Sequence, residues 1–313
     1  MSRARTGTAA ALALLLAALV GAGCGLGAGK EVGEATLTVT RDFGAGTVLA
    51  PVSEGVFEAD TVMRVLERDA KIETRYSGGF VQSIDGLAAD EEGEGGPTDW
   101  FFYVNGVESP IGAAEYSLHG GEAIWWDYHR WAATLQVPAV VGSWPQPFTG
   151  GYDGSRHPVS VVCLGGGAAC GTVRERLEGE GVSLARGAPP EGAIRVLVGP
   201  WRELKGDPAA AQIEHGPQTS GVFAKLDRRG GCEVLGLDES GDAMRPFGAR
   251  AGLIAATRRY EDPPTWVVTG CELSGVQEAA RRLDSADLRD HFAVAVEPGA
   301  GDHPPVALPV PNR

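Results

Sequence analysis

Positive charge is scarce in this sequence, with 27 Lys and Arg residues against 41 Asp and Glu residues and a formal net charge of −14 at pH 7. A surface that binds nucleic acid needs basic side chains to neutralise phosphates. We therefore expect no nucleic-acid partner. The chain has 313 residues, 43% hydrophobic and 22% charged, which suits one large or two ordinary folded domains rather than a disordered protein.

Motifs that carry catalysis are also missing. The sequence has no G-x-S-x-G, H-E-x-x-H or phosphate-loop pattern, and its six histidines are scattered. The glycine-rich stretch Gly165–Gly171 follows a predicted strand and opens a predicted helix, where backbone amides could hold an anion. It lacks the dinucleotide-binding spacing, so we interpret it as a turn beside a disulfide. We expect a protein that is not an enzyme, with no catalytic residues, no cofactor and no metal site.

The one long apolar run lies near the N-terminus. Arg3 and Arg5 precede Ala9–Val20, an uncharged stretch of twelve residues. This run is too short to span a bilayer as a helix, which needs roughly 20 residues, and it fits the apolar region of an export signal. It ends in Val20-Gly21-Ala22-Gly23-Cys24.

Small residues followed by Cys24 resemble a bacterial lipoprotein signal, in which the cysteine is acylated and becomes the first mature residue. We therefore expect a signal peptide over residues 1–24 and a Gly-rich tether over residues 25–34. The protein would lie outside the cytoplasm, attached to the cell membrane only through a lipid anchor on Cys24. A plain secretory signal with an incidental cysteine is the alternative.

Cysteine is rare, and its count agrees with export. Besides Cys24 there are four cysteines, an even number that suits disulfides in an oxidising compartment. Three pairings are possible, and we favour Cys163–Cys170 at one strand-to-helix turn with Cys232–Cys271 between two strand ends. A zinc site is the rival, but no C-x-x-C spacing occurs and no histidine lies at ligand spacing beside these cysteines.

The first half of the chain, residues 35–131, predicts strands around one short helix. Asp60 or Thr61 can cap a helix that runs to about Asp69 and has apolar residues on one face. Strands are predicted on both sides of that helix: Ala35–Thr40, Thr47–Ala50, Ile72–Tyr76, Gly78–Asp85, Trp100–Val104 and Glu122–Trp131. A helix packed on a mixed sheet after an opening hairpin is the β-grasp arrangement, an α+β fold.

The second half has a different pattern. The Pro- and Gly-rich residues 132–158 are typical of a linker. Residues 159–299 then alternate strand and helix, as in an α/β domain whose sheet is covered on both faces. The predicted elements are strands Val159–Leu164, Ala193–Gly199, Thr265–Thr269 and Phe292–Val296, helices Ala168–Glu180, Gly248–Arg258 and Ser274–Leu283, and a hairpin of Gly221–Leu226 with Cys232–Asp238. Residues 300–313 form a Pro-rich tail.

Aromatic residues are concentrated in Trp100–Trp131, which holds four Trp, two Phe and three Tyr. Alternate residues of a strand point to opposite faces, so Trp125, His129 and Trp131 face away from the helix if Trp126 faces it. Aromatic side chains therefore lie on both faces of the sheet. The outer set must meet solvent, the second domain or a ligand.

Four segments between Thr74 and Tyr128 carry a family resemblance: Gly79-Phe-Val-Gln-Ser-Ile-Asp85, Trp100-Phe-Phe-Tyr103, Gly112-Ala-Ala-Glu-Tyr116 and Glu122-Ala-Ile-Trp126. Together they resemble the C-terminal β domain of transcobalamin and intrinsic factor, a module that recurs in bacterial surface lipoproteins of unknown function. The resemblance implies apolar contacts to one face of a corrinoid near Val81, Phe102 and Ile111. The carriers' helical barrel is absent, so residues 159–299 would have to close over the ligand.

These observations predict a non-enzymatic, lipid-anchored extracytoplasmic protein that binds cobalamin, another corrinoid or a similar amphipathic small molecule for uptake, with a membrane importer as the receiver. The candidate ligand-binding residues are Val81, Phe102, Tyr103, Ile111, Trp125, His129 and Trp131. The alternative is an envelope interaction or adhesion protein that uses the same module to bind protein or polysaccharide.

Overall fold

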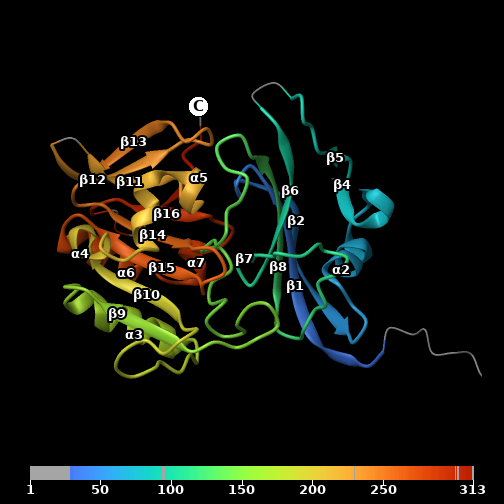
Figure 1. The fold of residues 1–313 in the computed structure, drawn as a ribbon, viewed down its shortest axis with the longest axis horizontal. Coiled ribbons are helices and arrows are strands. Elements are labelled where there is room, and N and C mark those ends of the chain that lie inside the picture. The colour runs from blue at the N-terminus through green and yellow to red at the C-terminus, as the bar shows by residue number, and fades with distance from the viewer. Residues whose placement is uncertain (1–28, 94–95, 229, 300, 302, 312–313) are drawn as a thin grey trace, which may run out of the picture.

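A computed structural model describes residues 29–93, 96–228, 230–299, 301 and 303–311. Cys24 and the expected signal peptide lie outside the described residues. The described chain forms two halves that pack side by side, with the segment that follows the first half running between them (Figure 1). Both halves are strand-rich mixtures of helix and sheet, which agrees with the expected arrangement of an α+β part followed by an α/β part.

The N-terminal half is built on a five-stranded sheet with the order β2-β1-β8-β6-β7. Its strands are β1 (Glu31–Arg41), β2 (Gly46–Phe57), β6 (Thr98–Val104), β7 (Val107–Glu108) and β8 (Ala123–Arg130). β1 and β8 are parallel, and the other neighbouring pairs are antiparallel. β1 starts at Glu31, inside the expected tether, because this stretch already pairs its backbone with the end of β2.

One face of this sheet is covered by α2 (Val62–Asp69) and a small three-stranded sheet. That sheet consists of β3 (Ile72–Arg75), β4 (Phe80–Ile84) and β5 (Leu87–Ala88), with the short helix η1 (Tyr76–Gly78) between β3 and β4. The expected cap is confirmed, since the Thr61 side chain accepts a hydrogen bond from the backbone N–H of Arg64 at 3.3 Å. The apolar face of α2 packs against β1, β6 and β8 in one buried cluster.

The C-terminal half contains a six-stranded mixed sheet with the order β17-β16-β14-β15-β10-β9. Its strands are β9 (Val159–Cys163), β10 (Ile194–Pro200), β14 (Gly252–Thr257), β15 (Thr265–Gly270), β16 (Ala293–Val296) and β17 (Val306–Leu308). Helices α3 (Ala168–Gly179) and α6 (Leu273–Arg281) cover one face, and α7 (Ser285–Leu288) follows α6.

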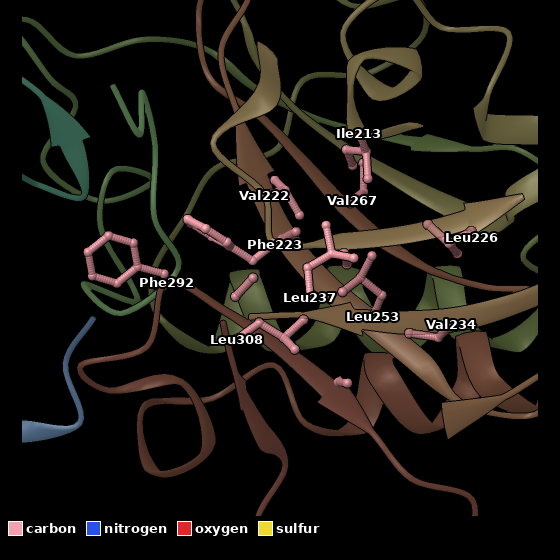
Figure 2. Packing of buried hydrophobic residues seen from close by; sticks show 14 of the residues in the cluster. Ile213, Val222, Phe223, Leu226, Val234, Leu237, Leu253, Val267, Phe292 and Leu308 are labelled. Carbon is pink, nitrogen blue, oxygen red and sulfur yellow. The ribbon is translucent and has the colours of Figure 1, made fainter. Parts of the chain in front are cut away.

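The opposite face of the six-stranded sheet is covered by a second small sheet and by short helices. These are β11 (Ala224–Arg228), β12 (Gly231–Leu237), β13 (Ala243–Gly248), α4 (Trp201–Leu204), η2 (Ala210–His215) and α5 (Pro217–Ser220). Figure 2 shows Val222, Phe223 and Leu237 packed close to Leu253 in this layer. The expected sheet with both faces covered is therefore present.

The expected helix over Gly248–Arg258 is wrong. Gly252–Thr257 forms β14, which pairs antiparallel with β15, and all six residues are buried. Gly252 is required by close packing, because a Cβ there would collide with the carbonyl oxygen of Gly275 in α6. A short, continuous apolar run that starts at a glycine is typical of a strand covered on both faces, and its alanine content obscures that pattern.

Two further segments are more ordered than their composition indicates. Within the Pro-rich tail, β17 pairs with β16 at the sheet edge, which is where proline-flanked strands are tolerated. Residues 132–158 contain no named helix or strand, yet Val140, Val141 and Trp144 are buried in the structure. The turn residue Asn105 holds this segment, since its Nδ2 donates to the Gly151 carbonyl at 2.8 Å. Residues 132–158 are thus packed between the halves.

Both expected disulfides are confirmed. Cys163 is bonded to Cys170 with a Cα–Cα distance of 5.9 Å, and Cys232 is bonded to Cys271 with a Cα–Cα distance of 5.6 Å. The first closes the turn between β9 and α3, as interpreted from the glycine-rich sequence there. Disulfides of this kind are typical of proteins outside the reducing cytoplasm.

Candidate functional site

Aromatic side chains lie on both faces of the five-stranded sheet, as the alternation predicted. In the β6–β8 register, Phe102 is opposite Trp126 and Tyr103 is opposite Trp125. Phe102 and Trp126 belong to the cluster under α2, with ring centroids 5.0 Å apart. Tyr103 and Trp125 belong to the cluster that the C-terminal half completes. The two faces therefore have different neighbours.

We call Tyr103, Trp125 and His129 the interface rings, because the C-terminal half covers them. Each lies against Phe292, with ring-centroid distances of 5.6, 5.2 and 5.3 Å. All three are buried, and burial raises the pKa of Tyr103 well above its usual range. The sequence left three possible neighbours for this face: solvent, the second domain or a ligand. In the structure, the second domain covers it. In this arrangement the interface rings join the two halves.

A buried carboxylate fixes the geometry around His129. Asp127 accepts hydrogen bonds from the backbone N–H groups of Phe43 at 3.0 Å and Gly44 at 2.8 Å, and from the hydroxyl of Thr40. Its Oδ1 lies 2.8 Å from Nδ1 of His129. The His129 ring in turn stacks on Phe43 with centroids 4.4 Å apart. Asp127 therefore ties the β1–β2 turn to the interface rings.

The other predicted contact residues lie elsewhere. Val81 is buried in the cluster under α2, and Phe102 is half-buried there. Trp131 is half-buried just beyond β8, with its backbone N–H donating to the Pro97 carbonyl. Ile111 is 46% exposed on the loop after β7. The structure therefore does not bring the seven predicted residues to one surface.

A compact apolar surface does occur where the β3–β4 connection meets the loop after β7. Tyr76 is 81% exposed, Phe80 is 37% exposed, and their ring centroids are 6.2 Å apart. Ile111 is on the adjoining loop, where a Cβ on Gly112 would lie 3.7 Å from the carbonyl oxygen of Gly79. We call Tyr76, Phe80 and Ile111 the tip cluster.

The backbone under the tip cluster is held in unusual conformations. Tyr76 and Ser77 have φ values of 52° and 61°, a left-handed region that costs energy for residues with a side chain. On the second loop, the Ser109 hydroxyl lies 2.9 Å from the carbonyl oxygen and 3.2 Å from the backbone nitrogen of Ile111. Strained turns that expose large apolar side chains are characteristic of functional surfaces.

Two clefts lie between the halves. The first, of about 750 Å³, is lined by β1, β8, residues 142–146 and residues 285–290. The second, of about 450 Å³, is lined by residues 108–110, by parts of the 132–158 segment and by residues 258–261. Burial in the second cleft raises the pKa of Glu108 to about 7. Neither cleft includes the tip cluster, although Pro110 joins the second cleft to Ile111.

Sequence reasoning missed Tyr76, Phe80 and Glu108. Strand alternation could have identified Phe80, because Val81 is its immediate neighbour and only one of them can face the core. A pair of aromatics flanking Gly78-Gly79 is also a signal, since turns seldom carry two large rings without a role. Glu108 gives no such signal, because its burial depends on residues far away in the chain.

One protein-family model matches part of the chain. Residues 59–130 match the family model described as Domain of unknown function (DUF4430). No curated protein matches the chain.

Among solved structures, a candidate metal binding protein from Ruminococcus gnavus ATCC 29149 is similar, with 17% identity and a TM-score of 0.25 over 32% of this chain and 98% of that chain. Haptocorrin in complex with Cbi is similar with 16% identity and a TM-score of 0.24, over 33% of this chain and 26% of the haptocorrin chain.

Metal-binding clusters and membrane-spanning helices do not occur in the described residues. Across residues 29–93, 96–228 and 230–299 and the described part of the tail, no group of three or more His, Cys, Asp or Glu side chains could hold a metal ion. Within the same part of the chain, no helix is long and apolar enough to cross a membrane.

Proposed function

We propose that this protein is a non-enzymatic, extracytoplasmic binding protein whose β-grasp-type N-terminal half holds a flat amphipathic small molecule on the tip cluster. The observation that carries the proposal is the exposure of Tyr76, Phe80 and Ile111 at two adjoining turns. Exposed rings and aliphatic side chains suit a bulky planar ligand, because they offer apolar contact with little loss of conformational freedom.

A corrinoid is the ligand class that we propose first. The sequence resemblance to the β domain of the vitamin carriers implies contacts near Val81, Phe102 and Ile111, and the tip cluster contains Ile111 and the neighbour of Val81. The second cleft begins at Pro110, so the C-terminal half could contact the rim of a ligand seated on the cluster. A membrane importer would receive such a ligand, and lipid on Cys24 would keep the protein beside it.

A visible-absorbance titration with cobalamin and cobinamide tests this proposal. We expect a spectral shift and retention of the corrinoid on the purified protein at about 10–50 μM. The triple variant Tyr76→Ser, Phe80→Ser, Ile111→Ser should lose most of the binding. A matched control changes Met244→Ser and Leu273→Ser, two exposed apolar residues on the other half of the molecule, and should bind as the wild type does. Wild-type protein that neither shifts nor retains either corrinoid would exclude this ligand class.

The alternative function is recognition of a protein or polysaccharide in the cell envelope. It is favoured by one observation, which is that the tip cluster lies outside both clefts and could meet a flat partner. Envelope material retained by the wild type and lost by the tip triple variant, in protein that ignores corrinoids, would support it. Lipid attachment is tested separately by metabolic labelling with palmitate, which Cys24→Ala should abolish.

A further inference from the structure

The two disulfides lie in different surroundings. Cys163, at the end of β9, is exposed, whereas Cys170, in the first turn of α3, is only 7% exposed. Cys232 and Cys271 are both half-buried and pack against the buried cluster between the C-terminal sheets. A solute can therefore reach the first disulfide directly at Cys163, while the second disulfide is partly covered at both ends.

The loop that the first disulfide closes is also held by backbone contacts that do not need the S–S bond. The Leu164 N–H donates to the Val198 carbonyl at 2.9 Å, and a Cβ on Gly166 would lie 2.8 Å from the same carbonyl oxygen. A Cβ on Gly199 would lie 1.9 Å from the Leu164 carbonyl oxygen. This turn is therefore packed tightly on the end of β10, and its two cysteines should stay close together when the disulfide opens.

The first disulfide closes a much shorter loop than the second. Its cysteines are 7 positions apart, whereas Cys232 and Cys271 are 39 positions apart. In the chain-entropy account, a disulfide stabilises a protein by restricting the unfolded chain, and this effect grows with the length of the closed loop. Cys163–Cys170 should therefore contribute less to stability than the second disulfide, and the fold should survive its opening.

Arg174, one turn further along α3, places positive charge beside the exposed sulfur. Its Nη2 lies 3.8 Å from Sγ of Cys163 and donates to the Val161 carbonyl at 3.1 Å. In the parts of the chain that the structure describes, no carboxylate forms an ion pair with Arg174. Reactive cysteine sulfurs typically lie in such electropositive, partly exposed settings.

We propose that the Cys163–Cys170 disulfide is a thiol–disulfide exchange site that reacts with small anionic thiols. The thiolate of the small molecule attacks Sγ of Cys163 and forms a mixed disulfide, while the bond to Cys170 breaks and its electron pair leaves on the Cys170 sulfur, which takes a proton from water. A second molecule of the thiol then attacks the sulfur of the first. This step releases the oxidised thiol dimer and leaves Cys163 as a thiol after protonation. Two electrons thus pass from two thiol molecules to the protein.

Each end of the reacting bond has a group that stabilises negative charge. The Cys170 sulfur leaves from the first turn of α3, where the positive end of the helix dipole favours a thiolate. The Arg174 guanidinium lies beside the attacked sulfur, and it also attracts a thiol that carries a sulfonate or carboxylate group. The site depends neither on the tip cluster nor on corrinoid binding.

Differential alkylation of the purified protein tests the proposal, with the second disulfide as the internal control. The native protein is treated with the anionic thiol 2-mercaptoethanesulfonate, free thiols are alkylated at intervals, and peptide mass spectrometry follows each disulfide. We expect Cys163–Cys170 to open at least about ten-fold faster than Cys232–Cys271. Equal rates of opening for the two disulfides would overturn the proposal.

The charge of the thiol tests the role of Arg174. Cysteamine carries an ammonium group, so the rate with 2-mercaptoethanesulfonate divided by the rate with cysteamine reports on attraction at the site, and the intrinsic reactivities of the thiols cancel when a variant is compared with the wild type. Arg174→Gln should lower this ratio at least about three-fold, because the positive charge beside the attacked sulfur is lost. The control Arg176→Gln removes a cation of the same helix that donates to the Arg281 carbonyl at 2.8 Å, and it should change the ratio less than about two-fold. An unchanged ratio in Arg174→Gln would contradict the selection of anionic thiols.

Two single-cysteine variants test which sulfur is attacked. Cys170→Ser leaves Cys163 as a free thiol, and Cys163→Ser leaves Cys170 free. With the anionic reagent dithiobis(nitrobenzoate), Cys163 should react at least about ten-fold faster than Cys170, because of the two only Cys163 is exposed. Both variants lack the same disulfide, and their melting curves verify that the fold is retained. Faster reaction at Cys170 would show that the attack does not occur at Cys163.

Discussion

The interface rings and the tip cluster are built from the same kinds of side chain within one half of the molecule, but their surroundings are opposite. Tyr103, Trp125 and His129 are buried against Phe292, whereas Tyr76 in the β3–β4 connection is 81% exposed and Phe80 at the start of β4 is 37% exposed. Burial of large rings is a main source of stability. Exposed rings contribute little to folding, and they are retained where they contact something else. The first set therefore stabilises the fold, and the second set is available for the ligand binding that we propose.

Contacts between the two halves fix their relative position. Of the interface rings, Tyr103 and Trp125 belong to a cluster that continues into the layer between the C-terminal sheets. An ion pair between Arg130 and Glu239, with N···O 2.5 Å, also crosses between the halves. A ligand at either cleft would therefore meet walls from both halves whose relative position is fixed by packing.

The largest expected effect comes from removing an interface ring. Trp125→Ala leaves a cavity beside Phe292 and removes the hydrogen bond that Nε1 donates to the Thr40 hydroxyl at 2.7 Å. We expect the free energy of unfolding to fall by about 3–5 kcal/mol. Guanidinium denaturation measures this loss. Trp131→Ala, at a half-buried position just beyond the same strand, should cost less than half as much. Equal losses would mean that Trp125 does not join the halves.

The next largest loss of stability is expected at Asp127, whose carboxylate holds His129 and the β1–β2 turn. Asp127→Asn keeps the shape of the side chain but replaces one acceptor oxygen with an NH₂ group, which faces donors from the Phe43–Gly44 backbone or from His129. We expect a loss of about 2–4 kcal/mol of unfolding free energy. Asp42→Asn, at an exposed neighbouring position, should change stability by less than about 0.5 kcal/mol. A neutral Asp127→Asn would contradict the proposed role of this network.

The pH dependence of the unfolding free energy tests Glu108 in the second cleft separately from the interface rings. The carboxyl of Glu108 has a pKa of about 7 in the folded protein against 4.5 in the unfolded chain, so the folded state binds the proton more tightly. Stability should therefore fall as pH rises from about 4.5 to 7, by about 2 kcal/mol after allowance for partial exposure. Denaturation midpoints at pH 5 and pH 8 measure this, and Glu108→Gln should remove that part of the difference. An unchanged difference in the variant would assign it to other groups.

Local patterns predicted the elements of the N-terminal half well. A cap at Asp60 or Thr61 and the alternation of rings in β6 and β8 follow from spacing along the chain, and the structure confirms the alternation and a cap at Thr61. In the C-terminal half, the two favoured disulfide pairings are also confirmed. The strand Gly252–Thr257 was mistaken for a helix, because burial on both faces removes the period of two that identifies a half-exposed strand.

The candidate site was harder to predict than the elements. Alternation placed Trp125 and His129 on the face away from α2, but no local pattern could show that Phe292, more than 160 positions later, covers that face. The tip cluster depends on the approach of Gly112 to Gly79, and the desolvation of Glu108 depends on Pro138 and the residues after β14. These are long-range contacts, which sequence spacing alone does not encode.

The smallest effect on stability is expected in the tip cluster, where the proposed effect on ligand binding is largest. Tyr76→Ser removes a side chain that is 81% exposed, so it should lower the unfolding free energy by no more than about 0.5 kcal/mol. Phe80→Ser and Ile111→Ser remove side chains that are 37% and 46% exposed, so each should cost about 1–2 kcal/mol, still less than Trp125→Ala. Tyr76→Gly should even stabilise slightly, because φ is 52° there and glycine adopts that conformation at little cost. Thermal melts of the three serine variants and of Tyr76→Gly, set beside their ligand retention, separate the two roles. A tip variant that unfolds as readily as Trp125→Ala would show that these exposed rings serve the fold, and the contrast between the two regions would then fail.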